Sequence, residues 1–194
     1  NSVEPIIIII LACLLFRDEF TKRQALGALL SLAGVLVLIT AGSIERLLRL
    51  DFNLGDIIVF CAYISWGLYA VLIRKLPREL DSLVVVTMLL GIGIPILLVP
   101  YLLESFYFRP VEFNWLTIST IIYLGLFSGA FSIVAWNYGI KTLGPIRAGQ
   151  FLHLIPAFTI LLATLLLDET LLPYHFGGIA LIVVGIYLAS QLNK

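Results

Sequence analysis

The chain has 194 residues, of which 61% are apolar and only 12% are charged, and its mean hydropathy is +1.09. Soluble domains carry about 25% charged residues, so this composition excludes a soluble globular protein and indicates an integral membrane protein. The 12 basic and 12 acidic residues balance, which leaves no surplus of positive charge for binding nucleic acid. Two cysteines in apolar stretches, Cys13 and Cys61, predict no disulfide framework.

Charge-free stretches predict six membrane spans, because about 20 helical residues cross the roughly 30 Å of hydrocarbon. A shorter apolar run, Pro5–Phe16, is predicted to be the second half of a span that begins at or before Asn1. The link from Ala41 to Asp56 contains Ile44–Leu50, a predicted connector helix at the lipid surface. The six full stretches are Gln24–Ile44, Ile57–Ile73, Ser82–Leu103, Phe113–Ile140, Ala148–Leu167 and Thr170–Asn193.

Two parts of the chain repeat each other at an offset of 151 residues. Each has an apolar helix with a proline, an acidic turn, and a second apolar helix with two glycines seven residues apart. Many membrane transporters are built from such repeats. We expect each acid to cap the helix that follows it. The matching pairs are Pro5 with Pro156, Asp18 with Glu169, Gly27 with Gly178, and Gly34 with Gly185.

Pairs of glycines on one helix face predict close helix packing. Seven residues are almost two helical turns, so the two glycines of each repeat share a face. Gly125 and Gly129 form a four-residue version of the same arrangement. The predicted packing glycines are Gly27, Gly34, Gly125, Gly129, Gly178 and Gly185.

The two copies differ in charge. The first turn, Arg17–Arg23, holds three basic residues, whereas the second, Asp168–His175, holds no Lys or Arg. Because basic loops stay in the cytoplasm, the copies are predicted to cross the membrane in opposite directions. Alternate loops on the side of the first turn carry nine of the twelve Lys and Arg residues, against three on the other side. We therefore expect a cytoplasmic C-terminus.

Several short motifs follow one another in the second half of the chain. They are Gly55–Lys75, Trp136–Lys141, Gly144–Gly149, Pro156, Asp168–Glu169 and Gly178–Gly185. Taken in this order they resemble the drug/metabolite transporter superfamily, of the EamA type. The resemblance implies an all-α polytopic membrane helix bundle of ten helices in two inverted five-helix repeats. Helices four to ten would be present here, and the first three would precede Asn1.

The same resemblance implies a division of the chain and a cellular location. Residues 1–44 would end the first repeat with helices four and five, and residues 45–56 would form an interfacial linker. Residues 57–191 would make the second repeat, helices six to ten, and residues 192–194 a cytoplasmic tail. The expected location is the cytoplasmic membrane of a bacterium or archaeon, with the substrate path between the repeats near the bilayer centre.

Glu4 is the first candidate for substrate binding. A carboxylate inside hydrocarbon costs about 2.5–3.5 kcal/mol on insertion scales, so it should face a cavity or a partner. There it would bind a cationic group or carry a coupling proton. Pro5 and Pro156 each free a backbone carbonyl and predict a helix kink. His153, one turn before Pro156, would hydrogen-bond a substrate, although a lone histidine is also a common packing residue.

Aromatic and hydroxyl side chains supply the other candidates. Tyr63, Trp66 and Tyr69 recur three residues apart and predict a wall that stacks on a planar or apolar substrate, although interfacial belts also collect such residues. Ser128 and Ser132 form a polar stripe that favours either substrate contact or hydrogen bonds between helices.

These features predict a secondary transporter, or permease, that moves a small organic metabolite or drug by alternating access, and no enzyme activity. The chain lacks a phosphate-binding loop and the metal or nucleophile motifs of membrane enzymes, so no cofactor or metal is expected. An amino acid, amine or neutral compound fits best. The alternatives are a sugar-phosphate or nucleotide-sugar carrier, which needs cations in its cavity, a non-transporting membrane protein, or an intramembrane enzyme.

Overall fold

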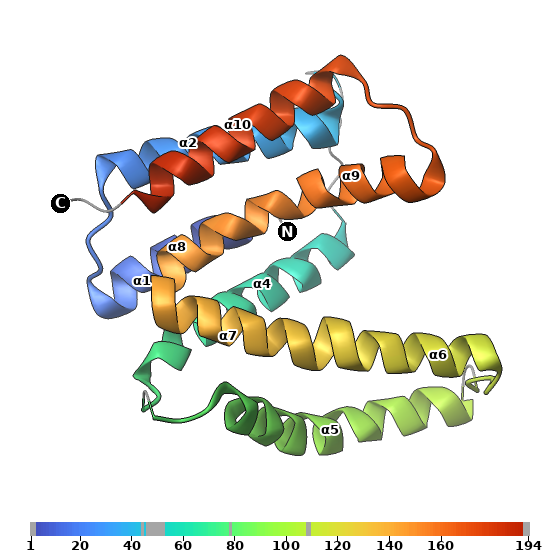
Figure 1. Ribbon diagram of the computed structural model, residues 1–194. Coiled ribbons are helices and arrows are strands. Elements are labelled where there is room, and N and C mark those ends of the chain that lie inside the picture. The colour runs from blue at the N-terminus through green and yellow to red at the C-terminus, as the bar shows by residue number, and fades with distance from the viewer. Residues whose placement is uncertain (1–2, 44, 46–52, 78, 108–109, 192–194) are drawn as a thin grey trace. The chain divides into compact units, whose positions relative to one another are not determined.

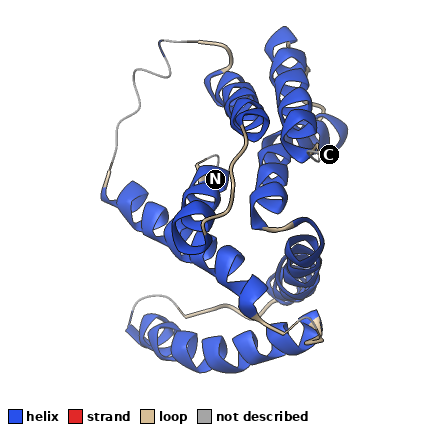
Figure 2. Cartoon of the chain, turned by 90° about the vertical axis from the view of Figure 1, so that its left-hand side faces the viewer, coloured by secondary structure: helices blue, strands red, loops and turns tan. Residues whose placement is uncertain are grey.

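The computed structural model describes residues 3–43, 45, 53–77, 79–107 and 110–191. All regular elements in these ranges are helical (Figure 2), and six of their helices are long and apolar enough to cross a membrane. The prediction of an all-α polytopic membrane bundle is therefore confirmed. Of the predicted surface helix Ile44–Leu50, every residue but Glu45 lies outside the described ranges.

The chain divides into two compact units, which are described in turn. The first contains residues 1–74 and 143–194, and the second contains residues 75–142. Short 3₁₀ segments, η1 (Ile73–Lys75) and η3 (Phe151–Leu154), follow α4 and α8. The α-helices of the first unit are α1 (Glu4–Phe16), α2 (Lys22–Thr40), α4 (Leu54–Leu72), α8 (Pro145–Gln150), α9 (Ile155–Leu167) and α10 (Pro173–Ser190).

The repeat seen in the sequence is also a repeat of structure. Helices α1 and α9 have the same length, and both of their ends correspond at the offset of 151 residues. The starts of α2 and α10 correspond in the same way. Each first helix ends on a left-handed residue that is not glycine, Arg17 with φ 54° and Asp168 with φ 53°. Such residues are uncommon, and here they recur at the same position of both repeats, directly after the first helix.

Helices α2 and α10 pack against each other with their backbones in near contact (Figure 1). A Cβ atom built on Gly27 would lie 2.4 Å from the carbonyl oxygen of Gly185, and one on Gly34 would lie 2.5 Å from that of Gly178. Real Cβ atoms do not approach so closely, so only glycine fits. The earlier glycine of α2, Gly27, meets the later glycine of α10, Gly185, so the two helices are antiparallel.

These contacts are symmetric under exchange of the two repeats. Gly27 contacts Ala189, and Gly178 contacts Leu38. These two contacts are equivalent, because Gly27 corresponds to Gly178 and Leu38 corresponds to Ala189 at the offset of 151 residues. Gly34 meets Ile182, and correspondingly Gly185 meets Ser31. A two-fold axis perpendicular to α2 and α10 would produce this pattern, and it is the local geometry of an inverted repeat.

A buried apolar cluster lies on this helix pair. Val35 and Leu38 of α2 meet Ile182 and Ile186 of α10, and all four are less than 9% exposed. Partly buried residues from η3, α9 and α10 complete the cluster, namely Leu154, Ile160 and Ile179. The core of the first unit is therefore shared by both repeats.

The second unit contains the long helix α5 (Ser82–Tyr107), followed by α6 (Trp115–Tyr123), the π-helical segment η2 (Leu124–Phe131) and α7 (Ser132–Leu143). The Lys141 ammonium donates a hydrogen bond to the Leu80 carbonyl, which ties α7 to the start of α5. Apart from its chain neighbours and the backbone of its own helix, no described atom lies within 4 Å of a Cβ built on Gly125, and for Gly129 the nearest is the Leu124 carbonyl oxygen at 3.4 Å. The structure thus places four of the six predicted packing glycines in a tight helix contact, but not this pair.

Candidate functional site

Glu4 and Trp66, two of the predicted substrate residues, meet at the first turn of α1. Glu4 is buried, with 7% of its surface exposed, and the Trp66 side chain hydrogen-bonds it. Because an indole N–H only donates, the Glu4 carboxylate is the acceptor. This bond fixes the carboxylate against α4.

The predicted aromatic wall lies on α4 beside this carboxylate. The rings of Trp66 and Tyr69 contact each other, with centroids 5.3 Å apart and planes tilted by 41°. Tyr63 lies three residues before Trp66, and all three side chains are half-buried. One carboxylate and two aromatic rings therefore form a single cluster, with Tyr63 close by on the same helix.

Two glycines that the sequence reasoning missed hold α1 between α4 and α8. A Cβ on Gly67 of α4 would lie 3.0 Å from side-chain atoms of both Ile7 and Leu11, and one on Gly149 of α8 would lie 3.2 Å from Ile8. Ile8 itself is completely buried. Small residues on both neighbours let α1 approach closely, and this brings Glu4 into the interior of the unit.

His153 lies in η3 and forms a buried polar pair with Ser31 of α2. The distance between His153 Nδ1 and Ser31 Oγ is 2.6 Å, and the residues are 1% and 0% exposed. The Ser31 hydroxyl also lies 3.1 Å from the Ala28 carbonyl oxygen, which accepts from it, and the donor in the bond between His153 and Ser31 depends on the tautomer of the imidazole. The structure places His153 in a helix contact, and its substrate role stays a prediction.

Pro156 is the second residue of α9, and α9 directly follows the 3₁₀ segment. The helix thus leaves α geometry just before the proline, where a backbone N–H is missing. Pro5 is likewise the second residue of α1. Residues 1–2 lie outside the described ranges, so the kink expected at Pro5 stays a prediction.

Gln150 is a buried polar residue that the sequence analysis did not select. It ends α8, it is 2% exposed, and neither its amide nitrogen nor its amide oxygen has a hydrogen-bond partner within the described part of the chain. One feature of the sequence could have drawn attention to it, because the candidate span Pro145–Leu167 contains no other Asn or Gln. Buried polar groups are nearly always paired in native proteins, so this one calls for an explanation.

These polar residues share a depth along their helices. Ser31 is the central residue of the candidate span Lys22–Thr40, and Trp66 lies near the centre of Leu54–Lys75. The segment η3 lies just before the centre of Pro145–Leu167. Glu4 corresponds to Ile155 in the repeat, which also lies beside that centre. If these helices span the bilayer, the polar side chains lie near its middle.

In the second unit the predicted serine stripe lies at another irregular segment. Ser128 is in the π-helix η2, and Ser132 begins α7. The Ser132 hydroxyl donates to the Phe127 carbonyl of its own helix at 2.7 Å, which satisfies a carbonyl in the widened turns. The π-helix covers the middle of the candidate span Trp115–Leu143, and such segments occur frequently at functional sites.

The acidic turn before α2 has a different role from the one predicted. Thr21, not Asp18, caps α2, in a capping box with Gln24, and α10 begins after Leu172 rather than after Glu169. The prediction of helix capping by Asp18 and Glu169 is therefore wrong. Instead, Asp18 accepts two hydrogen bonds from the Arg74 guanidinium, at 2.5 and 3.1 Å.

Arg74 closes one end of the first unit. Its guanidinium carbon lies 3.6 Å from the centroid of the Phe16 ring, in addition to the Asp18 bonds. Both partners of the ion pair keep about a quarter of their side-chain surface exposed, so the pair contributes little stability by itself. A cavity of about 400 Å³ lies here, and its wall carries charged and polar side chains. Its lining residues are Asp18, Glu19, Gln24, Arg74, Leu143, Gly144, Pro145, Ile146 and Arg147.

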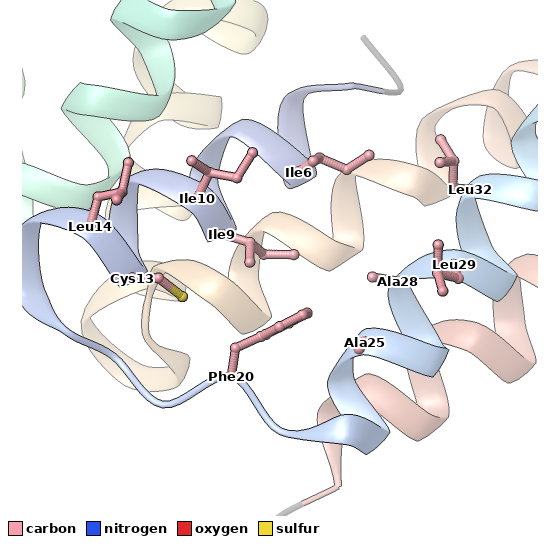
Figure 3. A pocket seen from close by; sticks show the side chains of 10 residues that line it. All are labelled: Ile6, Ile9, Ile10, Cys13, Leu14, Phe20, Ala25, Ala28, Leu29 and Leu32. Carbon is pink, nitrogen blue, oxygen red and sulfur yellow. The ribbon is translucent and has the colours of Figure 1, made fainter.

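A second cavity, of about 510 Å³, lies between α1 and α2 (Figure 3). Cys13 carries its only polar side-chain atom, and Phe20 reaches into it from the turn. A wall of this kind offers a substrate almost no hydrogen bonds. The cavity therefore suits an acyl chain or another apolar helix better than a polar metabolite. Its lining residues are Ile6, Ile9, Ile10, Cys13, Leu14, Phe20, Ala25, Ala28, Leu29 and Leu32.

The described residues contain no group of three or more His, Cys, Asp or Glu side chains that would hold a metal ion. The polar set of the first unit is a carboxylate, an amide, an imidazole, a hydroxyl and aromatic rings. It is suited to hydrogen bonding and to binding a cation.

The EamA-like transporter family matches residues 53–191. The uncharacterized transporter YyaM of Bacillus subtilis is 30% identical over all of this chain and 63% of its own length. An uncharacterized transporter of Archaeoglobus fulgidus is 28% identical over 91% of this chain and 60% of its own.

A third relative carries a more specific name. The "Probable amino-acid metabolite efflux pump" of Salmonella typhimurium is 27% identical over 92% of this chain and 61% of its own length. The chain thus spans about three fifths of the length of these curated relatives. No solved structure matches it.

Proposed function

Because this chain belongs to the EamA-like transporter family, we propose that it forms part of a secondary transporter for a small organic metabolite with a cationic amine. The transporter works by alternating access at a site near the bilayer middle. The observation that carries this proposal is the buried Glu4 carboxylate, which is held by Trp66 at the depth of the η3 break. Irregular helices with polar groups at that depth are typical of transporter binding sites.

The substrate class follows from the charges inside the spans. In the described helices the Lys and Arg side chains lie at or beyond the ends of the candidate spans, as Lys22, Arg74 and Lys141 do. A phosphorylated sugar or nucleotide would therefore meet no cation near the centres of these described spans. A carboxylate favours an amine, and the aromatic rings of α4 add cation–π attraction. The name of the Salmonella relative agrees with an amino-acid-like compound.

Inverted topology supports the alternating-access part of the proposal. The symmetric contacts of α2 with α10 are those of two elements related by an axis perpendicular to the helices, which lies in the membrane plane if both helices span it. Inverted repeats of this kind give two states of similar energy, open to opposite sides, when one repeat rocks against the other.

Transport itself is tested with the purified protein in proteoliposomes. We expect an outward or inward gradient of unlabelled amine-bearing metabolite to drive exchange of the labelled compound, at a rate well above that of empty liposomes. A scaffold or an enzyme would move nothing. Absence of exchange for every amine, amino acid and neutral metabolite tried would overturn the proposal.

Topology is tested by labelling two equivalent turn positions. In a protein with Cys13→Ala and Cys61→Ala, we place single cysteines by Glu19→Cys or by Thr170→Cys, which correspond at the offset of 151. A maleimide that does not cross membranes should label the first only in inside-out vesicles and the second only in intact cells. Labelling of both positions from one side would contradict the inverted arrangement and the cytoplasmic C-terminus derived with it.

A further inference from the structure

Gln150 is the least satisfied buried side chain of the described residues. Both ends of its amide lack a partner although the residue is only 2% exposed. Leaving a buried donor or acceptor unpaired carries the full desolvation cost of that group, and the bilayer interior offers no bulk water to offset it. An apolar residue of the same size would avoid this cost, so a stability role does not account for the glutamine.

The position of Gln150 connects it to the Glu4 cluster. Its neighbour Gly149 contacts Ile8, one helical turn after Glu4, and η3, which begins directly after Gln150, also contacts α1. The segment that carries Gln150 therefore packs against the helix that begins with Glu4.

We propose that Gln150 binds the carboxylate of a substrate whose ammonium group is bound by Glu4. This inference rests on the proposed function and narrows it to α-amino acids and close analogues. The amide nitrogen offers two N–H donors to the carboxylate. Glu4 supplies the single negative charge that matches the ammonium. The substrate carboxylate then accepts from an amide that has no partner among the described residues.

The chemistry predicts discrimination between an amino acid and the amine that lacks its carboxylate. A site built for hydrogen bonding rejects an analogue that leaves its polar groups unpaired. Four matched pairs serve as probes: L-alanine with ethylamine, L-serine with ethanolamine, L-leucine with isopentylamine, and L-phenylalanine with phenethylamine. Dissociation constants come from thermal-shift titrations of the purified protein at one pH, because binding to the folded state raises its Tm.

For at least one pair, the unchanged protein is expected to bind the amino acid about tenfold more tightly than the amine or better, since a hydrogen bond to a charged group contributes enough for that ratio. Gln150→Leu should bring the ratio close to one. Its affinity for the amine should stay within about twofold, and its Tm without ligand should be equal or higher, because the orphaned amide is gone.

Three outcomes would overturn the inference. In the first, Gln150→Leu keeps the ratio, as expected if only water satisfies the amide. In the second, it weakens amino acid and amine equally, as expected of a structural role. In the third, the Tm of Gln150→Leu without ligand falls further below that of the unchanged protein than the Tm of Gln191→Leu does. Gln191→Leu is the control, because it makes the same change at the end of α10. If Gln150→Leu cannot be purified, Gln150→Met and Gln150→Asn take its place.

These measurements distinguish failure of the Gln150 role from failure of the proposed transport function. If the unchanged protein binds and exchanges the amines but prefers none of the amino acids, the carboxylate role of Gln150 is wrong and the transporter proposal stands. If no probe binds and none is exchanged in proteoliposomes, the proposed amine specificity fails, and this inference fails with it.

Discussion

Glu4→Gln is expected to lower exchange of an amine-bearing substrate by roughly ten- to hundredfold, the factor that corresponds to losing one hydrogen bond to a charged group. The variant keeps an amide oxygen that accepts from Trp66, so the contact between α1 and α4 is preserved. What it loses is the negative charge that faces the ammonium. The measurement is the initial rate of counterflow in proteoliposomes, compared for a cationic amine and a neutral metabolite of similar size.

A matched control for this variant is Glu19→Gln, which makes the same chemical change at an exposed residue of the turn between α1 and α2. Its exchange rate should equal that of the unchanged protein. If Glu4→Gln slowed the neutral and the cationic compound equally and also removed any response to a pH gradient, Glu4 would carry a coupling proton and not the amine. Unchanged flux for both compounds would exclude either role.

Gly185→Ala is expected to destabilise the protein by about 1–3 kcal/mol, the cost of forcing extra atoms into a packed contact. The added Cβ would lie 2.5 Å from the backbone nitrogen of Ser31 and 2.6 Å from the carbonyl oxygen of Gly27. Backbone atoms cannot rotate away as the end of a side chain can, so α2 and α10 must separate. Thermal unfolding in detergent measures the loss as a lower Tm.

Gly177→Ala is the control, because it makes the same change in α10 but brings the new Cβ within 4 Å of no described atom outside its chain neighbours and its own helix backbone. It should leave Tm unchanged or slightly raised, since alanine favours helix more than glycine does. By the symmetry of the two repeats, Gly34→Ala should behave as Gly185→Ala does, because its Cβ would meet the Gly178 carbonyl oxygen at 2.5 Å. Equal Tm values for all three variants would contradict the close approach of the helices.

The spans were largely predictable from local composition. The predicted stretch Ser82–Leu103 lies within the observed α5, and Ala148–Leu167 lies within the candidate span Pro145–Leu167. The repeat was equally visible, since the offset of 151 residues recurs in the ends of α1 and α9. Both signals are local: whether a segment enters the bilayer depends on its own transfer free energy and length.

The partners of the polar residues were not predictable in the same way. Sequence reasoning selected Glu4 and Trp66 separately, and the structure brings them together. It selected His153 without Ser31, which lies 122 positions away in the chain. It assigned Asp18 to helix capping because acids are common before helices. In the structure Thr21 caps α2, and the Asp18 carboxylate accepts from Arg74, which lies 56 positions later in the chain.

The amino-acid sequence alone thus determined that the chain is a bundle of membrane helices with an internal repeat, because hydrophobicity and periodicity are properties of each segment by itself. Tertiary structure alone decided which polar groups are satisfied and which are not. Ser31 and His153 hydrogen-bond each other, while Gln150, three residues before His153, is buried without a partner among the described residues. Whether a polar group is paired depends on which helix faces it, and that is set by close contacts such as Gly149 on Ile8.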